Sequence, residues 1–267
     1  MKKIIVLLLI TFFVVSCSEY QKIFNGKDIK AKYKMAWKMY EKEKYRKAEE
    51  LFSQVDKYYK FKPTYQRLLF AHAMSLFHLR EYLSAGELLR KFTRLFPEST
   101  KAEEADFYIV KSYFALSPKY TVDQSYTTRG IEEIGQFLKR HPYSKYKDEV
   151  NKMNKILNEK LEHKAFDTAK MYYDLDLYKA AITSFNNFLV EFPGTVYKTD
   201  ALFYRLKAAS DLAINSVESK KQKRLKKALE YYKNFIKKHS NSKYKNEVEK
   251  LHKKLVKEID NKENKAV

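Results

Sequence analysis

The sequence contains a single cysteine, Cys17, among 267 residues. One cysteine cannot form an intrachain disulfide, so the stability of the fold has to come from packing. Glycine and proline are also scarce, with five of each. Because β-rich chains with many tight turns use both residues often, their scarcity favours a helical protein.

Arginine is rare compared with lysine, with 9 Arg and 45 Lys. Together with 33 acidic residues, these give a formal charge of +21. Proteins that read nucleic acid favour the planar arginine fork, so we expect no nucleic-acid partner. A lysine-rich surface suits anionic lipid headgroups or an acidic protein. The alternative, that lysine only covers solvated helix faces, remains open.

The motifs of common enzymes are missing, among them G-x-S-x-G and G-x-G-x-x-G. Gly130 and Gly135 have the spacing of a P-loop, but Gln136-Phe137 stands where Lys-Ser/Thr is required. His72 and His78 lie six residues apart, not the four that would place two metal ligands on one helix face. We therefore expect no enzymatic activity, no cofactor and no metal.

Two acidic pairs, Glu49-Glu50 and Glu103-Glu104, fall on polar helix faces, where we expect them to be solvated. His141 and His239 occupy a helix-end position that phenylalanine fills in other parts of the chain. We expect both histidines to serve packing.

The N-terminus reads as a targeting segment. Two lysines follow Met1, and the twelve residues from Ile4 to Val15 are apolar except for Thr11. Twelve residues are too few to span a bilayer, which needs about 20, but they fit the apolar region of a signal peptide.

The run ends in Val14-Val15-Ser16-Cys17, which resembles the lipobox of bacterial lipoproteins. We predict a signal peptide over 1–16, acylation of Cys17 (palmitate among the chains), and a lipidated polar tether over 17–28. Ser18, in place of an aspartate, favours the outer membrane. An ordinary signal peptide cleaved elsewhere, or a buried structural cysteine, are the alternatives.

The stretch from Ala169 to Pro193 supplies the repeating pattern of the chain. Small and apolar residues recur every three or four positions on both sides of 175–177, which predicts two amphipathic helices joined by a tight turn. The frame consists of Ala169, Tyr172, Tyr178, Ala181, Phe185, Phe188 and Pro193. Four further versions of the frame predict an all-α chain of five helical hairpins.

The hairpins resemble tetratricopeptide repeats, since Pro63 and Pro97 are 34 residues apart, the length of that repeat. We expect a right-handed superhelical array over 29–260, with a polar tail over 261–267. The fourth hairpin is expected to begin with a long helix from Ser144 to Tyr173. The fifth is expected to contain a basic loop over Ser219–Arg224, and a capping helix is expected to begin at Ser242.

Four hairpin ends share a pattern in which serine or threonine follows two residues after proline or its equivalent. Proline stops one helix, and the hydroxyl is expected to cap the next. The segments are Phe96-Pro97-Glu98-Ser99, His141-Pro142-Tyr143-Ser144, Phe192-Pro193-Gly194-Thr195 and His239-Ser240-Asn241-Ser242.

The whole mature chain resembles the BamD family of outer-membrane β-barrel assembly lipoproteins. The specific part is its second half, from His141 through Asp148, across Lys160–Ala165 and Tyr172–Ala181, to Asp200-Ala201-Leu202. Of the family's functional residues, only Cys17 can be matched individually.

This resemblance implies a non-catalytic scaffold on the periplasmic face of the outer membrane, anchored by its lipid. Its C-terminal repeats would dock a BamA-like barrel protein and other assembly-complex subunits, and its N-terminal repeats would receive unfolded outer-membrane protein precursors. The alternative is a tetratricopeptide lipoprotein that acts as an adaptor in cell-envelope or peptidoglycan organisation.

Overall fold

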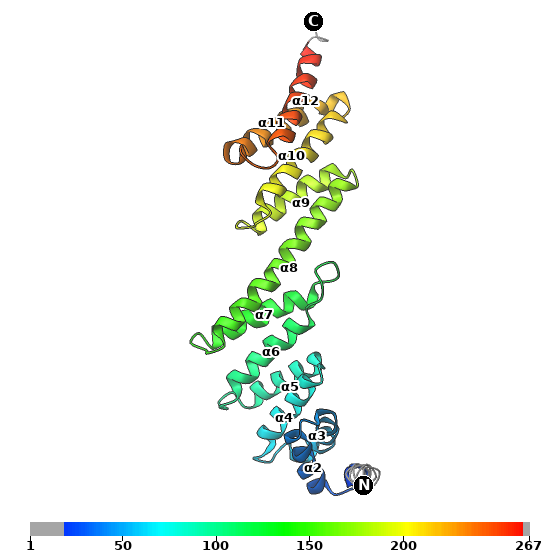
Figure 1. Cartoon of the computed structure of the whole chain (residues 1–267), viewed down its shortest axis with the longest axis vertical. Coiled ribbons are helices and arrows are strands. Elements are labelled where there is room, and N and C mark those ends of the chain that lie inside the picture. The colour runs from blue at the N-terminus through cyan, green and yellow to red at the C-terminus, as the bar shows by residue number, and fades with distance from the viewer. Residues whose placement is uncertain (1–18, 264–267) are drawn as a thin grey trace, which may run out of the picture. The chain divides into compact units, whose positions relative to one another are not determined.

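The computed structural model describes residues 19–263, and all regular structure in that range is helical (Figure 1). The chain divides into two compact units, Met1–Leu157 and Asn158–Val267. The prediction of an all-α array of tetratricopeptide-like hairpins is confirmed.

Three hairpins build the described part of the first unit, and each helix packs on the next one along the chain. The long helix α8 begins after them. Their helices are α2 (Ile29–Glu41) with α3 (Tyr45–Tyr59), α4 (Tyr65–His78) with α5 (Tyr82–Leu95), and α6 (Ala102–Leu116) with α7 (Ser125–Arg140).

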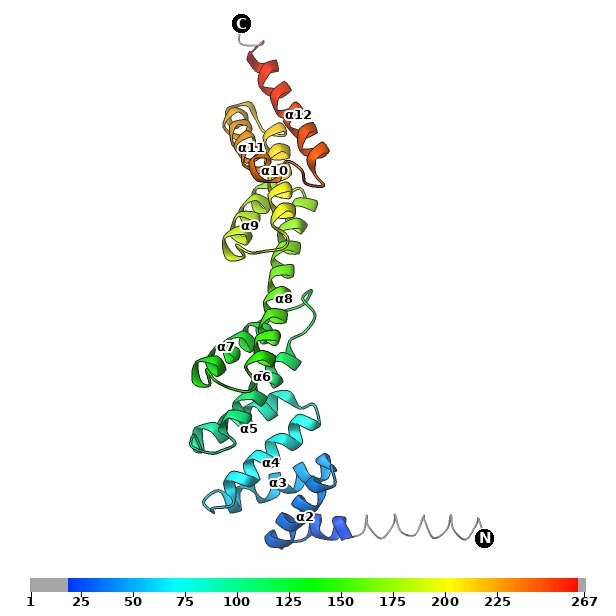
Figure 2. The ribbon, with the colours of Figure 1, turned by 60° about the vertical axis from the view of Figure 1, so that its left-hand side comes forward.

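The second unit contains two hairpins and the capping helix. It consists of the later part of α8 (Lys147–Asp174), α9 (Tyr178–Glu191), α10 (Lys198–Ile214), α11 (Glu218–His239) and α12 (Lys245–Glu263). Helix α12 packs against both α10 and α11 (Figure 2). It buries Val248, Leu251 and Leu255 there, so the expected cap closes the last hairpin.

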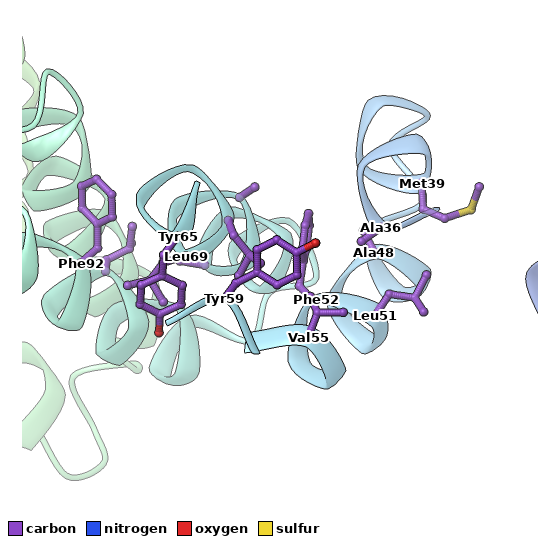
Figure 3. Packing of buried hydrophobic residues seen from close by; sticks show 14 of the residues in the cluster. Ala36, Met39, Ala48, Leu51, Phe52, Val55, Tyr59, Tyr65, Leu69 and Phe92 are labelled. Atoms are coloured by element: carbon purple, nitrogen blue, oxygen red, sulfur yellow. The ribbon is translucent and has the colours of Figure 1, made fainter. Parts of the chain in front are cut away.

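The cores combine small residues with aromatic rings. In the first unit, Ala36 and Ala48 are fully buried in the same cluster as Phe52 and Phe92 (Figure 3). Ala73 is fully buried in that cluster as well. In the second unit, Ala169 and Ala181 share a cluster with Phe185 and Phe188. Each buried phenylalanine contributes about 1.5–3 kcal/mol through the hydrophobic effect.

The turns between hairpins repeat one hydroxyl contact. Ser99, Ser144 and Thr195 each accept a hydrogen bond from the backbone N–H two residues later, at 3.0–3.1 Å. Each hydroxyl also bonds a side chain of an earlier helix: Gln66, Glu103 and Glu162, respectively. These hydroxyls therefore fasten the turn to the preceding hairpin.

The prediction that these hydroxyl residues are the N-cap residues of the next helices was wrong. The helices after Ser99 and Thr195 have their N-cap residues two positions later, at Lys101 and Tyr197, and neither makes a side-chain cap bond. The hydroxyl of Ser242 is buried and makes no hydrogen bond among the described residues.

His141 and His239 serve packing, as expected, and each ring at a hairpin end lies on the phenylalanine four residues earlier. The centroid distances are 5.1–5.6 Å for the pairs Phe92–Phe96, Phe137–His141, Phe188–Phe192 and Phe235–His239. His141 gains a polar partner as well, since its Nε2 lies 2.9 Å from the buried carboxylate of Asp106.

Two boundaries differ from expectation. The predicted basic loop Ser219–Arg224 is helical and forms the first turns of α11. Lysine and arginine are good helix formers, no glycine or proline interrupts the stretch, and Glu218 lies favourably at the positive end of the helix dipole. Helix α8 has 28 residues, about 42 Å, and starts after the turn that Ser144 holds.

The chain before α2 is packed against the first hairpin. Residues 19–25 are helical, and Tyr20 is 6% exposed within the first core cluster. The described part of the segment expected as a tether, 19–28, is thus fixed to the fold, while Cys17 and Ser18 lie outside the described residues.

Three residues in the turns within hairpins adopt left-handed backbone conformations. Glu43, Arg80 and Asp176 have φ of 55°, 62° and 58°, and a tyrosine that begins the next helix follows each of them by two positions. Non-glycine residues pay roughly 1–2 kcal/mol in this region. The turn geometry is therefore imposed by helix packing against local preference.

We predict that Arg80→Gly raises the free energy of unfolding by about 0.5–1 kcal/mol, because relief of strain exceeds the entropy that glycine loses. Asp176→Gly should be near neutral, since it also removes the 2.6 Å bond from the Tyr178 hydroxyl to Asp176. Urea unfolding of both variants measures the difference. A destabilised Arg80→Gly protein would contradict the strain argument.

Candidate functional site

A pocket of about 380 Å³ opens in the first unit, between the first two hairpins and the start of the third. This volume lies in the range of small-ligand sites, roughly 300–1,000 Å³. Its lining comes from α2, α4, α5 and the turns beside them. The residues are Trp37, Tyr40, Pro63, Gln66, Arg67, Phe70, Ala71, Phe92 and Lys101.

Aromatic side chains and two cations shape the pocket. The guanidinium of Arg67 lies 4.1 Å from the centroid of the Trp37 ring, and the Lys101 Nζ lies 5.5 Å from that of Phe70. Trp37 meets Tyr40 edge-on at 5.8 Å, which fixes its ring. Arg67 makes no ion pair with a described carboxylate, so its charge is available to a ligand.

The pocket offers aromatic surface and positive charge. Burial, followed by the nearby Tyr45 and Glu104, raises the pKa of Tyr40 to about 12, so its phenol stays protonated at neutral pH. The lining contains no serine, cysteine, histidine or carboxylate that would act as nucleophile or general base. Aromatic and apolar side chains beside the Arg67 guanidinium suit an apolar group that carries a negative charge.

The histidines that the sequence raised as metal candidates lie in separate environments. His72 Nε2 lies 3.6 Å from Glu49, whereas His78 stacks on Tyr45 with ring centroids 4.2 Å apart. Burial lowers the pKa of His78. Among residues 19–263 no group of three potential ligands could hold a metal ion.

Gly130 lies inside helix α7, which removes the resemblance to a P-loop. A Cβ added there would lie 2.8 Å from the Leu157 Cδ1 and 3.7 Å from the Tyr113 backbone. The glycine permits close packing of helices.

The expectation that the acidic pairs are solvated was wrong. Glu50 accepts a bond from Tyr20, Glu103 accepts one from Ser144, and Glu49 faces His72. Glu104 pairs with Lys101 at 2.7 Å. All four are partly buried because the helices they face bring partners to them.

The sequence interpretation missed the pocket residues. Trp37 is the only tryptophan of the chain and Arg67 is one of nine arginines, so the sequence shows that both residue types are rare. Their proximity was not visible, because they lie 30 positions apart on different hairpins. Cys17, the one predicted site residue, lies outside the described residues, so its acylation remains a prediction. Within the described range, no helix combines the length and apolar character needed to cross a membrane.

We predict that Arg67→Ala shifts the emission of Trp37 and lowers the free energy of unfolding by about 0.5–1 kcal/mol, the usual size of an exposed cation–π contact. Arg94→Ala is the matched control, since Arg94 is exposed and lies outside the pocket. Fluorescence spectra and urea unfolding test this, and equal spectral shifts in both variants would contradict the contact.

Comparison with known proteins places the chain in a family. The model of the family YfiO, described as outer membrane lipoprotein, matches residues 26–225. The outer membrane protein assembly factor BamD of Rickettsia prowazekii is 25% identical over 166 residues, which cover 62% of this chain and 66% of that protein, slightly less than two thirds.

Among solved structures, a thermophilic TPR protein of Thermus thermophilus is 15% identical, with 86% of this chain and all of that one covered. The TM-score of this alignment is 0.31. The family match spans most of the chain and includes the hairpins that line the pocket. The chain therefore belongs to the YfiO/BamD family of outer membrane lipoproteins.

Proposed function

We propose that this protein is a lipid-anchored, non-catalytic scaffold of outer-membrane β-barrel assembly. The observation that carries the proposal is the family match over residues 26–225. A stack of helical hairpins suits the role, because its extended surfaces can hold partner chains without a deep active site.

The anchor in this proposal is Cys17, on the periplasmic face of the outer membrane. Acyl chains contribute about 0.8 kcal/mol for each buried CH₂, so two or more chains hold a protein firmly. The family description and the apolar run that ends at Cys17 support this assignment.

We expect labelled palmitate to enter the wild-type protein and to be absent from Cys17→Ala. Ser16→Ala is the matched control, because it keeps a small residue before the cysteine and should stay labelled. Mass spectrometry of the purified proteins gives the same answer independently. Label in the Cys17→Ala protein would refute the anchor.

The pocket of the first unit is our candidate for binding unfolded precursors. Barrel strands alternate apolar and polar residues, so an extended precursor offers an apolar side chain at every second position. One aromatic side chain would lie on Trp37 and Phe70, while a neighbouring carboxylate would meet Arg67.

This model predicts that a synthetic peptide of alternating apolar residues, with an aromatic residue beside its C-terminal carboxylate, changes Trp37 fluorescence on binding. Arg67→Ala should weaken the affinity about tenfold or more, the value of a hydrogen bond to a charged group. Arg94→Ala should bind normally, and amidation of the peptide should reproduce the loss. Equal affinity of all variants would exclude the pocket.

The C-terminal repeats are the proposed docking surface for a BamA-like barrel protein. Two turns of the second unit expose apolar side chains: Leu175 and Leu177 between α8 and α9, and Val217 between α10 and α11. Exposed apolar side chains that gather in one patch mark protein interaction sites.

Co-purification from native membranes in mild detergent tests the docking. We expect the barrel protein to accompany the wild-type chain, and Leu175→Lys/Leu177→Lys to lose it. Val190→Lys, a similarly exposed apolar position on α9, is the control. A wild-type chain free of barrel protein, with altered wall synthesis after depletion, would favour the adaptor role in envelope organisation.

A further inference from the structure

The segment before the first hairpin is docked by several independent contacts. The Tyr20 hydroxyl donates to a Glu50 carboxylate oxygen at 2.6 Å, and its ring is buried in the core cluster of the first hairpins. Lys47 Nζ lies 4.7 Å from the Tyr20 ring centroid, and Lys38 Nζ lies 3.1 Å from Glu19. The chain is therefore fixed to the hairpin from Glu19 onward.

This docking leaves almost no free chain between the fold and the predicted lipid. Tyr20 follows Cys17 by three residues, and three extended residues span at most about 11 Å. A flexible twelve-residue tether over 17–28 would have a root-mean-square span of about 17–21 Å and could extend much further.

Lysines surround the docked segment. Lys34, Lys38 and Lys42 follow one another at intervals of four residues, which places them on one side of α2 and its C-cap, beside Glu19. Lys22 belongs to the docked segment itself, and Lys47 covers the Tyr20 ring. We call these five residues the basic face. Lys22, Lys34 and Lys42 are exposed and make no ion pair with a described residue.

We propose that the first hairpin lies directly on the lipid surface, with the basic face in contact with anionic phosphate headgroups. The inference rests on the acylation of Cys17 put forward above. The anchor selects lipid over an acidic protein, because it brings headgroups within about 11 Å of Tyr20, close to the screening length of about 8–10 Å in physiological salt.

Lysine fits this role. Its ammonium is a point charge on a flexible stem, so it needs no fixed partner geometry on a fluid lipid surface. Because the segment next to the lipid is docked, the lipid holds the first hairpin rigidly against the membrane. We call this arrangement the rigid mount. The first unit is held at the membrane in one orientation, and its pocket is presented at a set height above the bilayer.

The test uses the lipidated full-length protein in vesicles that carry a headgroup-attached quencher. A dye is placed at Lys34→Cys, and Cys17 does not react because its sulfur carries the lipid. We expect strong quenching in phosphatidylglycerol-containing vesicles. Tyr20→Ala should lower the quenching at least about twofold, because a tether released from the hairpin spans about twice the distance of the docked chain.

Tyr20→Phe keeps the ring and loses only the bond to Glu50, so it should remain docked and quenched. Circular dichroism and thermal melting show whether each variant keeps its helices. Equal quenching in wild-type protein and a folded Tyr20→Ala variant would overturn the rigid mount.

Charge is tested with two matched double variants of the labelled protein. Each lysine contributes about fivefold to the equilibrium between membrane contact and detachment of the basic face. Lys22→Gln/Lys42→Gln should therefore shift this equilibrium about 25-fold toward detachment. Lys223→Gln/Lys226→Gln removes the same charge from exposed positions on α11 that make no ion pair with a described residue, and it should change nothing. Equal effects of both pairs, or equal quenching in pure phosphatidylcholine vesicles, would refute the basic face.

The two proposals fail in distinguishable ways. Absence of lipid on Cys17 in the mass spectrum refutes the anchor. A lipidated protein whose dye at position 34 is not quenched refutes the mount and leaves the anchor intact.

Discussion

The close approach of two helices at small residues is the constraint on which each hairpin depends. Ala36 and Ala48, Ala73 and Ala85, and Ala169 and Ala181 are fully buried, with the same spacing of twelve residues in each pair. Gly130 takes this place on α7, where an added Cβ would meet Leu157. Larger side chains at these positions would separate the backbones and displace the aromatic rings between hairpins.

Buried charges then fix which helix faces which in the first unit. Glu133 is 2% exposed and lies between Arg90 and Arg129, and Asp106 is held by Arg140 at 2.7 Å. Removing one partner from such a cluster costs about 3–5 kcal/mol, whereas replacing all partners with apolar groups can be neutral. These clusters act on specificity of packing more than on net stability.

The same packing creates the features that bear on function. The Trp37 ring packs edge-on against Phe52 and Tyr40, which keeps its remaining surface toward the pocket and Arg67. In the same hairpin, Glu50 of α3 accepts a hydrogen bond from the Tyr20 hydroxyl. One hairpin thus serves both the candidate binding pocket and the proposed contact with the membrane, so a change in its packing would affect both.

The sequence by itself determined the hairpins, the capping helix and the packing role of His141 and His239 at the hairpin ends. These features follow from periodicity and turn residues, which act over a few positions of the chain. Only the tertiary structure decided that Trp37, Arg67 and Lys101 line one pocket and that Tyr20 is docked. Periodicity shows which side of a helix is buried, but it does not show which residues of successive helices come opposite one another. The pairing of residues depends on the distance and the angle at which the helices cross. The side chains of all the packed helices together set this distance and this angle.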